Sequence, residues 1–136
     1  MMNPAKISLL LLIFALTAQA QLAITVLPAK LTGQKEIVSL AITNNMAEPV
    51  NSARAVCFLL DDQGKMVGQS TKWVIGGTKD HPALRPTFGT TFNFVITSPQ
   101  PWVTTNLTPK ISFSRVVLDG GKLADIKHDV LVTDAN

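Results

Sequence analysis

The fold is decided by the stretch Ile37-Val38-Ser39-Leu40-Ala41-Ile42-Thr43-Asn44, in which large apolar residues alternate with small or polar ones. Successive residues of a strand point to opposite sides, so the apolar residues of this stretch share one face of an extended chain. Such alternation is typical of a strand that is buried on one face only. The sequence therefore predicts a strand over Ile37–Asn44 that packs its apolar face against a core.

Similar short runs, rich in Val, Ile, Phe and Thr, recur along the chain and are separated by Gly, Pro, Asn and Asp. The other predicted strands are Leu22–Leu27, Ser52–Leu60, Lys65–Gly68, Thr71–Ile75, Thr90–Thr97, Ile111–Leu118 and, closing a hairpin, Lys122–Thr133. This pattern predicts an all-β fold, an immunoglobulin-like antiparallel two-sheet sandwich of about seven strands. The expected core residues are Val38, Leu40, Ile42, Phe92, Phe94, Ile96, Ile111 and Phe113.

The first twenty residues have the pattern of a secretory signal peptide. Lys6 precedes the apolar run Ile7–Leu16, and Ala18-Gln19-Ala20 fits a small-x-small cleavage site. Ten apolar residues make a helix of roughly 15 Å, too short for the ~30 Å hydrocarbon core of a bilayer. The alternative is an uncleaved anchor. We expect a periplasmic or secreted protein with no membrane span after cleavage, and a single β-sandwich domain over residues 21–136.

Charge and cysteine content exclude several classes of function. Beyond residue 20 the chain has eleven basic and nine acidic side chains, scattered without a cluster. Nucleic-acid or membrane-surface binding would need a clustered basic face, so neither is expected. Cys57 is the only cysteine and lies in the apolar run Ala53–Leu60, which predicts a buried, inert thiol. A catalytic cysteine would instead need a histidine and an activating environment.

No residue pattern predicts an active site, a metal centre or a bound cofactor. His81 lies in a loop, and His128 shares the strand phase of Ile126 and Val130 and is expected to point inward. A zinc site needs three or four convergent ligands, which two distant histidines and a buried cysteine do not supply. The chain also lacks a Gly-x-Ser-x-Gly nucleophile motif. We therefore expect no catalytic, metal or cofactor residues, and a protein that is not an enzyme.

The middle of the chain resembles the FxLYD family of small exported or cell-surface β-sandwich domains. Ile42-Thr43-Asn44-Asn45 matches the family's strand and Asn-rich turn, and Cys57-Phe58-Leu59-Leu60-Asp61 stands where Phe-x-Leu-Tyr-Asp occurs in the family. Gly64 supplies the turn, and Leu84-Arg85-Pro86 precedes the next strand. Cys57 replaces the family's Phe, and Leu60 replaces its Tyr. The resemblance implies an accessory or interaction module and carries over no catalytic residue.

A docking surface is predicted on one face of the sheet. In the strand Ser52–Leu60 both phases are apolar beyond Arg54, whereas a solvated face normally alternates apolar with polar residues. With Cys57 pointing inward, the outward residues of this strand lie beside the outward residues of the strand Ile111–Leu118. A bulge near Arg115 would instead shift the alternation of that second strand by one residue. The predicted patch is Val56, Phe58, Leu60, Val116 and Leu118. The alternative is that the C-terminal segment or a long loop covers this face.

These observations predict an exported, non-catalytic accessory or interaction module, with a protein partner or a second copy bound through a sheet face. The alternative is a carbohydrate-binding module that uses the loop residue Trp102 together with Trp73 or Phe88. Trp102 could equally cap the open end of the core, and Trp73 shares a phase with Ile75 and is expected to be buried. Exposed aromatics arranged in one row would favour the carbohydrate alternative.

Overall fold

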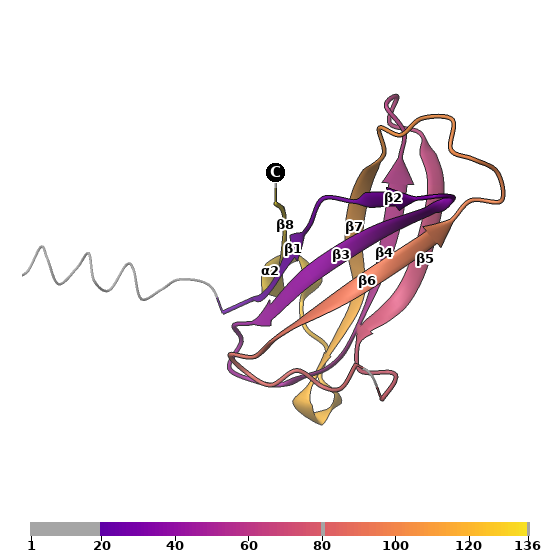
Figure 1. Ribbon diagram of the computed structural model, residues 1–136. Helices are drawn as coiled ribbons and strands as arrows, with labels where there is room; N and C mark the ends of the chain where they lie inside the picture. Colours follow the sequence, from indigo (N-terminus) through magenta and orange to yellow (C-terminus); the bar gives the residue numbers. More distant parts are fainter. Residues whose placement is uncertain (1–19, 80, 136) are drawn as a thin grey trace, which may run out of the picture.

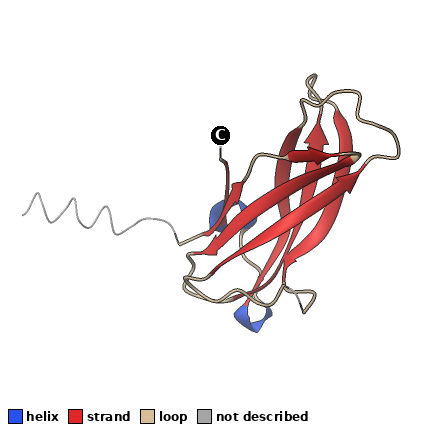
Figure 2. Ribbon diagram, in the orientation of Figure 1, coloured by secondary structure: helices blue, strands red, loops and turns tan. Residues whose placement is uncertain are grey.

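The structure, a computed structural model, describes residues 20–79 and 81–135. Two β-sheets pack face to face and enclose one core between them (Figure 1). Figure 2 shows that strands make up nearly all of the regular structure, with two short helical turns near the C-terminal end. The predicted two-sheet β-sandwich is therefore confirmed. The expected signal peptide over residues 1–20 lies outside the described residues except for Ala20, and no described helix is long and apolar enough to cross a membrane.

The five-stranded sheet is built around β3 (Lys35–Asn44), which contains the alternating stretch of the sequence. The antiparallel strand β6 (Gly89–Thr97) pairs with β3 along one side. On the other side β3 pairs with β1 (Leu22–Val26) and with the short β2 (Lys30–Thr32), both antiparallel. The last strand, β8 (Val130–Asp134), pairs in parallel with β1. One edge of this sheet is therefore the whole length of β6.

The three-stranded sheet has β4 (Val50–Leu60) at its centre, between β5 (Met66–Ile75) and β7 (Thr108–Leu118). The two strands predicted over residues 65–68 and 71–75 are a single strand, because Gln69 and Ser70 also pair with β4. Bulges interrupt the pairing of β4 with each neighbour. These bulges decide which side chains of this sheet face the core.

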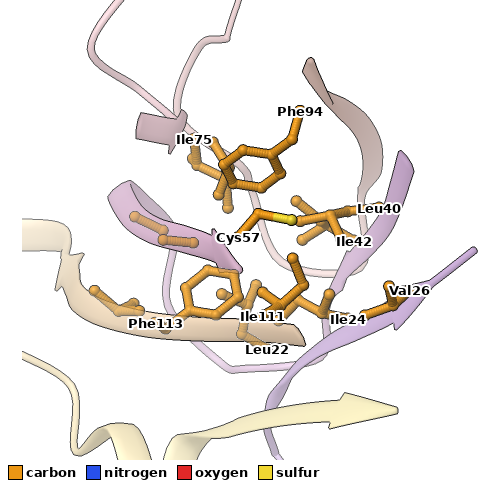
Figure 3. Packing of buried hydrophobic residues seen from close by; sticks show 14 of the residues in the cluster. Leu22, Ile24, Val26, Leu40, Ile42, Cys57, Ile75, Phe94, Ile111 and Phe113 are labelled. Atoms are coloured by element: carbon orange, nitrogen blue, oxygen red, sulfur yellow. The ribbon is translucent and has the colours of Figure 1, made fainter. Parts of the chain in front are cut away.

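The core lies between the two sheets and contains the predicted residues. Seven of the eight expected core residues are buried, and the eighth, Phe92, packs edge-on against Phe94 with ring centroids 5.1 Å apart. Cys57 is fully buried, and Figure 3 shows its sulfur pointing from the small sheet toward Leu40 and Ile42 of the large one. Each fully buried aliphatic side chain of this core stabilises the folded state by about 1.5–3 kcal/mol relative to the same side chain left exposed.

The predicted C-terminal hairpin over Lys122–Thr133 is wrong. After β7 the chain makes a 3₁₀ turn, η1 (Asp119–Gly121), and only the bridge between Val117 and Leu123 continues the pairing. A helical turn, α2 (Ile126–Asp129), then contacts β7, and the chain leaves for β1 of the other sheet. Ile126 packs against the core from this turn, so its burial is satisfied without a hairpin. The departure of β8 leaves β7 as an edge strand.

Candidate functional site

The candidate site is the outer face of the three-stranded sheet, where β4 carries three apolar residues in a row. The side chains of Val56, Phe58 and Leu60 point away from the core and are half-buried, while the alternate residues of β4 are fully buried. β4 lies between β5 and β7 (Figure 1), so these three residues run along the middle of the face. The predicted outward phase of β4 is therefore confirmed.

The predicted extension of this patch onto β7 is wrong. Arg54 pairs with Arg115 and Ala55 pairs with Phe113, so Ser114 is an extra residue on β7. A bulge of this kind shifts the side-chain alternation by one residue. Val116 and Leu118 consequently point inward, and only 1 % and 4 % of their surfaces are exposed.

A second bulge places Trp73 outside the core, contrary to the prediction. Ala53 pairs with Ile75 and Arg54 pairs with Trp73, which leaves Val74 as the extra residue on β5. Both Val74 and Ile75 are buried, whereas Trp73 is 38 % exposed. Trp73 lies diagonally across from Val56 on the outer face, a separation that long aromatic side chains can span.

At the other end of the face, Met66 on β5 pairs with Leu60 and is 51 % exposed. We call the five outward-facing apolar residues of this sheet the apolar outer stripe. The stripe consists of Trp73, Val56, Phe58, Leu60 and Met66. It replaces the predicted patch, because it extends onto β5 instead of β7.

Three basic residues lie on the outer face beside the apolar outer stripe. Lys110 pairs with Phe58, and the exposed residues Arg54 and Arg115 stand directly opposite each other on neighbouring strands. Like charges in directly opposed positions destabilise a sheet. Neither arginine forms a salt bridge within the described residues. The stripe therefore has two unpaired cations at one end.

The outer face of the large sheet provides an internal comparison. Ser39, Ala41 and Thr43 of β3 face outward there, and the Ser39 hydroxyl donates a hydrogen bond of 2.7 Å to Oδ1 of Asn93. Small and polar residues on an outward face are what a solvated antiparallel sheet normally shows. Apolar residues do occur on this face, where Ile37 lies beside Val95 and Leu131 of β8 is 43 % exposed. Only the small sheet, however, carries three large apolar residues in consecutive outward positions of one strand.

The C-terminal segment does not cover the apolar outer stripe. β8 pairs with β1 on the other sheet, and the Ala135 N–H donates to the Val26 carbonyl, so the described chain ends there. The elements with extensive contacts to β4 are its sheet neighbours β5 and β7, and the turn η1 touches it only slightly. Within the described residues the stripe is open.

Trp102 lies at one end of the core, beside a groove. Its ring packs against the core, with Cη2 3.5 Å from where a Cβ on Gly68 would lie. Its Nε1 atom is buried without a hydrogen-bond partner among the described residues. The groove beside it, of about 660 Å³, runs between the β4–β5 turn and the loop before β7. Trp102 therefore caps the core and also lines a surface groove.

In the part of the chain that the structure describes, Cys57 and the two histidines lie in separate places and form no common centre. Burial raises the pKa of the Cys57 thiol to about 12, which keeps it protonated and unreactive. His81 packs edge-on against Phe92, with ring centroids 4.9 Å apart.

His128 is exposed on α2, not inward as predicted, because the helical turn interrupts the alternation of the strand. A hydrogen bond to Asp129 raises the pKa of His128. No group of three His, Cys, Asp or Glu in the described part of the chain could hold a metal ion.

Two buried polar residues were not anticipated from the sequence. Glu36 and Asn44 both occupy inward positions of β3, at the two ends of the alternating stretch. Each lies two residues from a predicted core residue, Val38 or Ile42, and this spacing was the sequence signal that could have predicted their burial. Asn44 donates through Nδ2 to the carbonyls of Glu48 and Leu84 and accepts the N–H of Met46. It therefore ties the loop before β6 to β3.

Comparisons with known proteins add little to this description. A scan against protein-family models finds no match, and a search of curated protein sequences finds none either. Among solved structures the chain is similar to a β-glucuronidase from glycoside hydrolase family 2, with a TM-score of 0.40 and 19 % identity. That match covers 81 % of this chain and 10 % of the β-glucuronidase chain, so this chain spans a small part of the larger protein's length.

Proposed function

We propose that this chain is an exported, non-catalytic interaction domain that docks a protein partner on the apolar outer stripe. The observation that carries this proposal is the contrast between the two outer faces of one sandwich. The outer face of the large sheet mixes polar residues with scattered apolar ones such as Ile37 and Val95, whereas the face of the small sheet has three consecutive half-buried apolar residues along β4, with exposed Trp73 and Met66 beside them. A contiguous apolar patch on a soluble domain usually marks an interface.

The chemistry of the stripe also indicates what kind of partner it binds. Aromatic residues, Met and Arg are enriched at protein–protein interfaces, and Trp73, Met66 and Arg54 lie on this face. The opposed pair Arg54 and Arg115 would gain from a carboxylate placed between them, since buried or rim cations favour complementary charge. The partner surface is therefore apolar at its centre and acidic at the rim.

The test is affinity capture from the envelope fraction with three forms of the tagged protein. The double variant Phe58→Ser with Leu60→Thr removes the middle of the stripe, and Leu131→Ser removes an exposed apolar residue from the opposite outer face as the matched control. We expect a partner that the unaltered protein and Leu131→Ser both retain and that the double variant loses. Circular dichroism first confirms that each form is folded. Equal capture by all three folded forms contradicts the proposal.

The groove beside Trp102 supports a second candidate function, binding of a carbohydrate. Its wall combines the indole of Trp102 with the polar residues Asp62, Gln63 and Gln100. Trp73 and Phe88 do not line this groove, so the aromatics do not form the single row that would favour a sugar-binding face. Polysaccharide binding that persists in the Phe58→Ser, Leu60→Thr variant and is weakened by Gln100→Ala would favour this second function.

A further inference from the structure

The free edge of β6 is long and regular. Nine consecutive residue pairs join β6 to β3, from Lys35 with Thr97 to Thr43 with Gly89, and no bulge interrupts them. On its other side β6 has no hydrogen-bonded strand partner within the described residues, and β5 of the opposite sheet packs against it through side chains, with Ile96 Cγ2 3.0 Å from where a Cβ on Gly68 would lie. The edge is therefore a straight strand that can accept a further strand.

The hydrogen bonds at the two ends of β6 show which backbone groups face this edge. The Ser98 N–H donates to the Gln34 carbonyl, and the Asn44 N–H donates to the Phe88 carbonyl. In an antiparallel ladder, residues alternate between bonding to one neighbour and pointing toward the other side. Even-numbered residues of β6 thus bond to β3, and the odd-numbered ones direct N–H and C=O to the open edge. These are Gly89, Thr91, Asn93, Val95 and Thr97.

The edge strands β7, β5 and β8 carry features that prevent edge-to-edge pairing. β7 contains Pro109, Lys110 and Arg115 and is bulged. β5 contains Lys72 and is bulged twice against β4, and β8 is short and ends at Asp134. Charge, proline, bulges and shortness are the usual means of protecting an edge. β6 has none of them, since Gly89–Thr97 contains no charged residue and no proline.

We propose that β6 pairs antiparallel with β6 of a second copy of this chain, across a two-fold axis at Asn93. In such an isologous contact every residue near the axis meets its own copy or a close neighbour, so a charge there would face a like charge. An uncharged edge is therefore suited above all to pairing with itself. Thr91 would face Val95 of the second copy, and both are good strand formers.

The side chain of Asn93 supports this placement of the axis. Its Oδ1 accepts the hydrogen bond from Ser39, and its Nδ2 has no hydrogen-bond partner within the described residues. Facing its own copy, each Asn93 can donate from Nδ2 to the amide oxygen opposite. The contact joins the two large sheets into one continuous sheet and leaves the apolar outer stripe of both copies free, so it is independent of the proposed function.

Sedimentation of the protein expressed from its full sequence, from micromolar to millimolar concentration, tests the proposal. We expect a monomer–dimer equilibrium that Asn93→Lys weakens by about tenfold or more, because two lysines then meet at the axis. Thr25→Lys, on the outer face of the same sheet but on β1, is the matched control and should leave the dimer unchanged. Val95→Lys provides a second charged variant if Asn93→Lys fails to fold.

Hydrogen exchange locates the contact. Amides of Thr91, Asn93 and Val95 should become protected as the dimer forms, while the edge amides of β7 should not. A monomer at every concentration overturns the proposal, as does a dimer that both lysine variants retain. A dimer that is lost in the Phe58→Ser, Leu60→Thr variant also overturns it, because self-association would then use the apolar outer stripe.

Discussion

Glu36 shows how one residue can oppose the fold around it. It occupies an inward position of β3 and is only 3 % exposed, and its Oε2 has no hydrogen-bond partner within the described residues. Burial raises the pKa of this carboxyl above its ordinary value of 4.5. The folded state therefore holds the proton more tightly than the unfolded chain does. The stability that this proton contributes is complete below pH 4.5 and is lost as the pH rises through the raised pKa.

Replacing this carboxyl by an apolar group should stabilise the protein. We expect Glu36→Met to raise the free energy of unfolding at neutral pH by about 1–3 kcal/mol, the cost of leaving a buried polar group unpaired. Denaturant titrations measure it, and the gain should shrink as the pH falls through the raised pKa toward 4.5, below which the folded and the unfolded states of the unaltered protein both hold the Glu36 proton. Glu48→Met, which alters an exposed carboxylate paired with Lys122, is the control. A gain that does not depend on pH would contradict the account.

At the scale of elements, single extra residues decide which face a strand presents. Ser114 in β7 and Val74 in β5 each shift the alternation of their strand by one residue. Val116 and Leu118 enter the core for this reason, and Trp73 leaves it. The loop before β6 is placed differently, by side-chain hydrogen bonds. Asn44 reaches the Leu84 carbonyl over 2.9 Å, and Leu84 in turn bridges to Val50 of β4.

Removing the Asn44 amide should loosen that loop. We expect Asn44→Ala to lower the free energy of unfolding by about 3 kcal/mol, because it leaves buried backbone groups unpaired. Thermal or denaturant unfolding gives the value, and hydrogen exchange at the Leu84 amide should accelerate more than exchange in β1. Asn45→Ala, at the exposed neighbouring position, should change stability by less than about 0.5 kcal/mol. Equal losses in the two variants would show that the amide does not tie the loop to β3.

At the scale of the whole molecule, the apolar core has to stabilise the sandwich by itself. The one cysteine, Cys57, is buried and unpaired, and the described residues offer no metal-binding cluster. A domain of this size can bury about two thirds of the surface of its unfolded chain without such cross-links. The two sheets share one continuous cluster of buried side chains (Figure 3).

Stability should therefore be insensitive to reductant and to chelators. We expect the melting temperature to stay the same, within the error of calorimetry, after addition of dithiothreitol or of EDTA. A ligand bound only to the folded state raises its stability by mass action, so removing a structural metal would lower the melting temperature. A fall of several degrees with EDTA would reveal a metal site. Glu36→Met provides a positive control that the assay detects a shift.

Alternation alone was enough to predict most of the fold. The residues of Ile37–Asn44 alternate strictly, and β3 pairs along its whole length as that pattern requires. The inward phase of β4, with Cys57 buried, was likewise predictable, because only a local period of two residues is involved. Of the candidate site, the outward positions of Val56, Phe58 and Leu60 were predicted, whereas Trp73 and Met66 were not included.

The sequence by itself thus determined the fold class, the inward face of the central strands and the apolar outer row of β4, because these follow from residues one or two positions apart. Only the tertiary structure decided the outer partners of that row and the path of the last strand. A bulge depends on how two strands that are distant in the sequence match in length. The residues around Ser114 therefore contain no local sequence signal that predicts the bulge there. The choice of β1 over β7 as partner for β8 likewise depends on which side of the core is still uncovered once the other strands have packed.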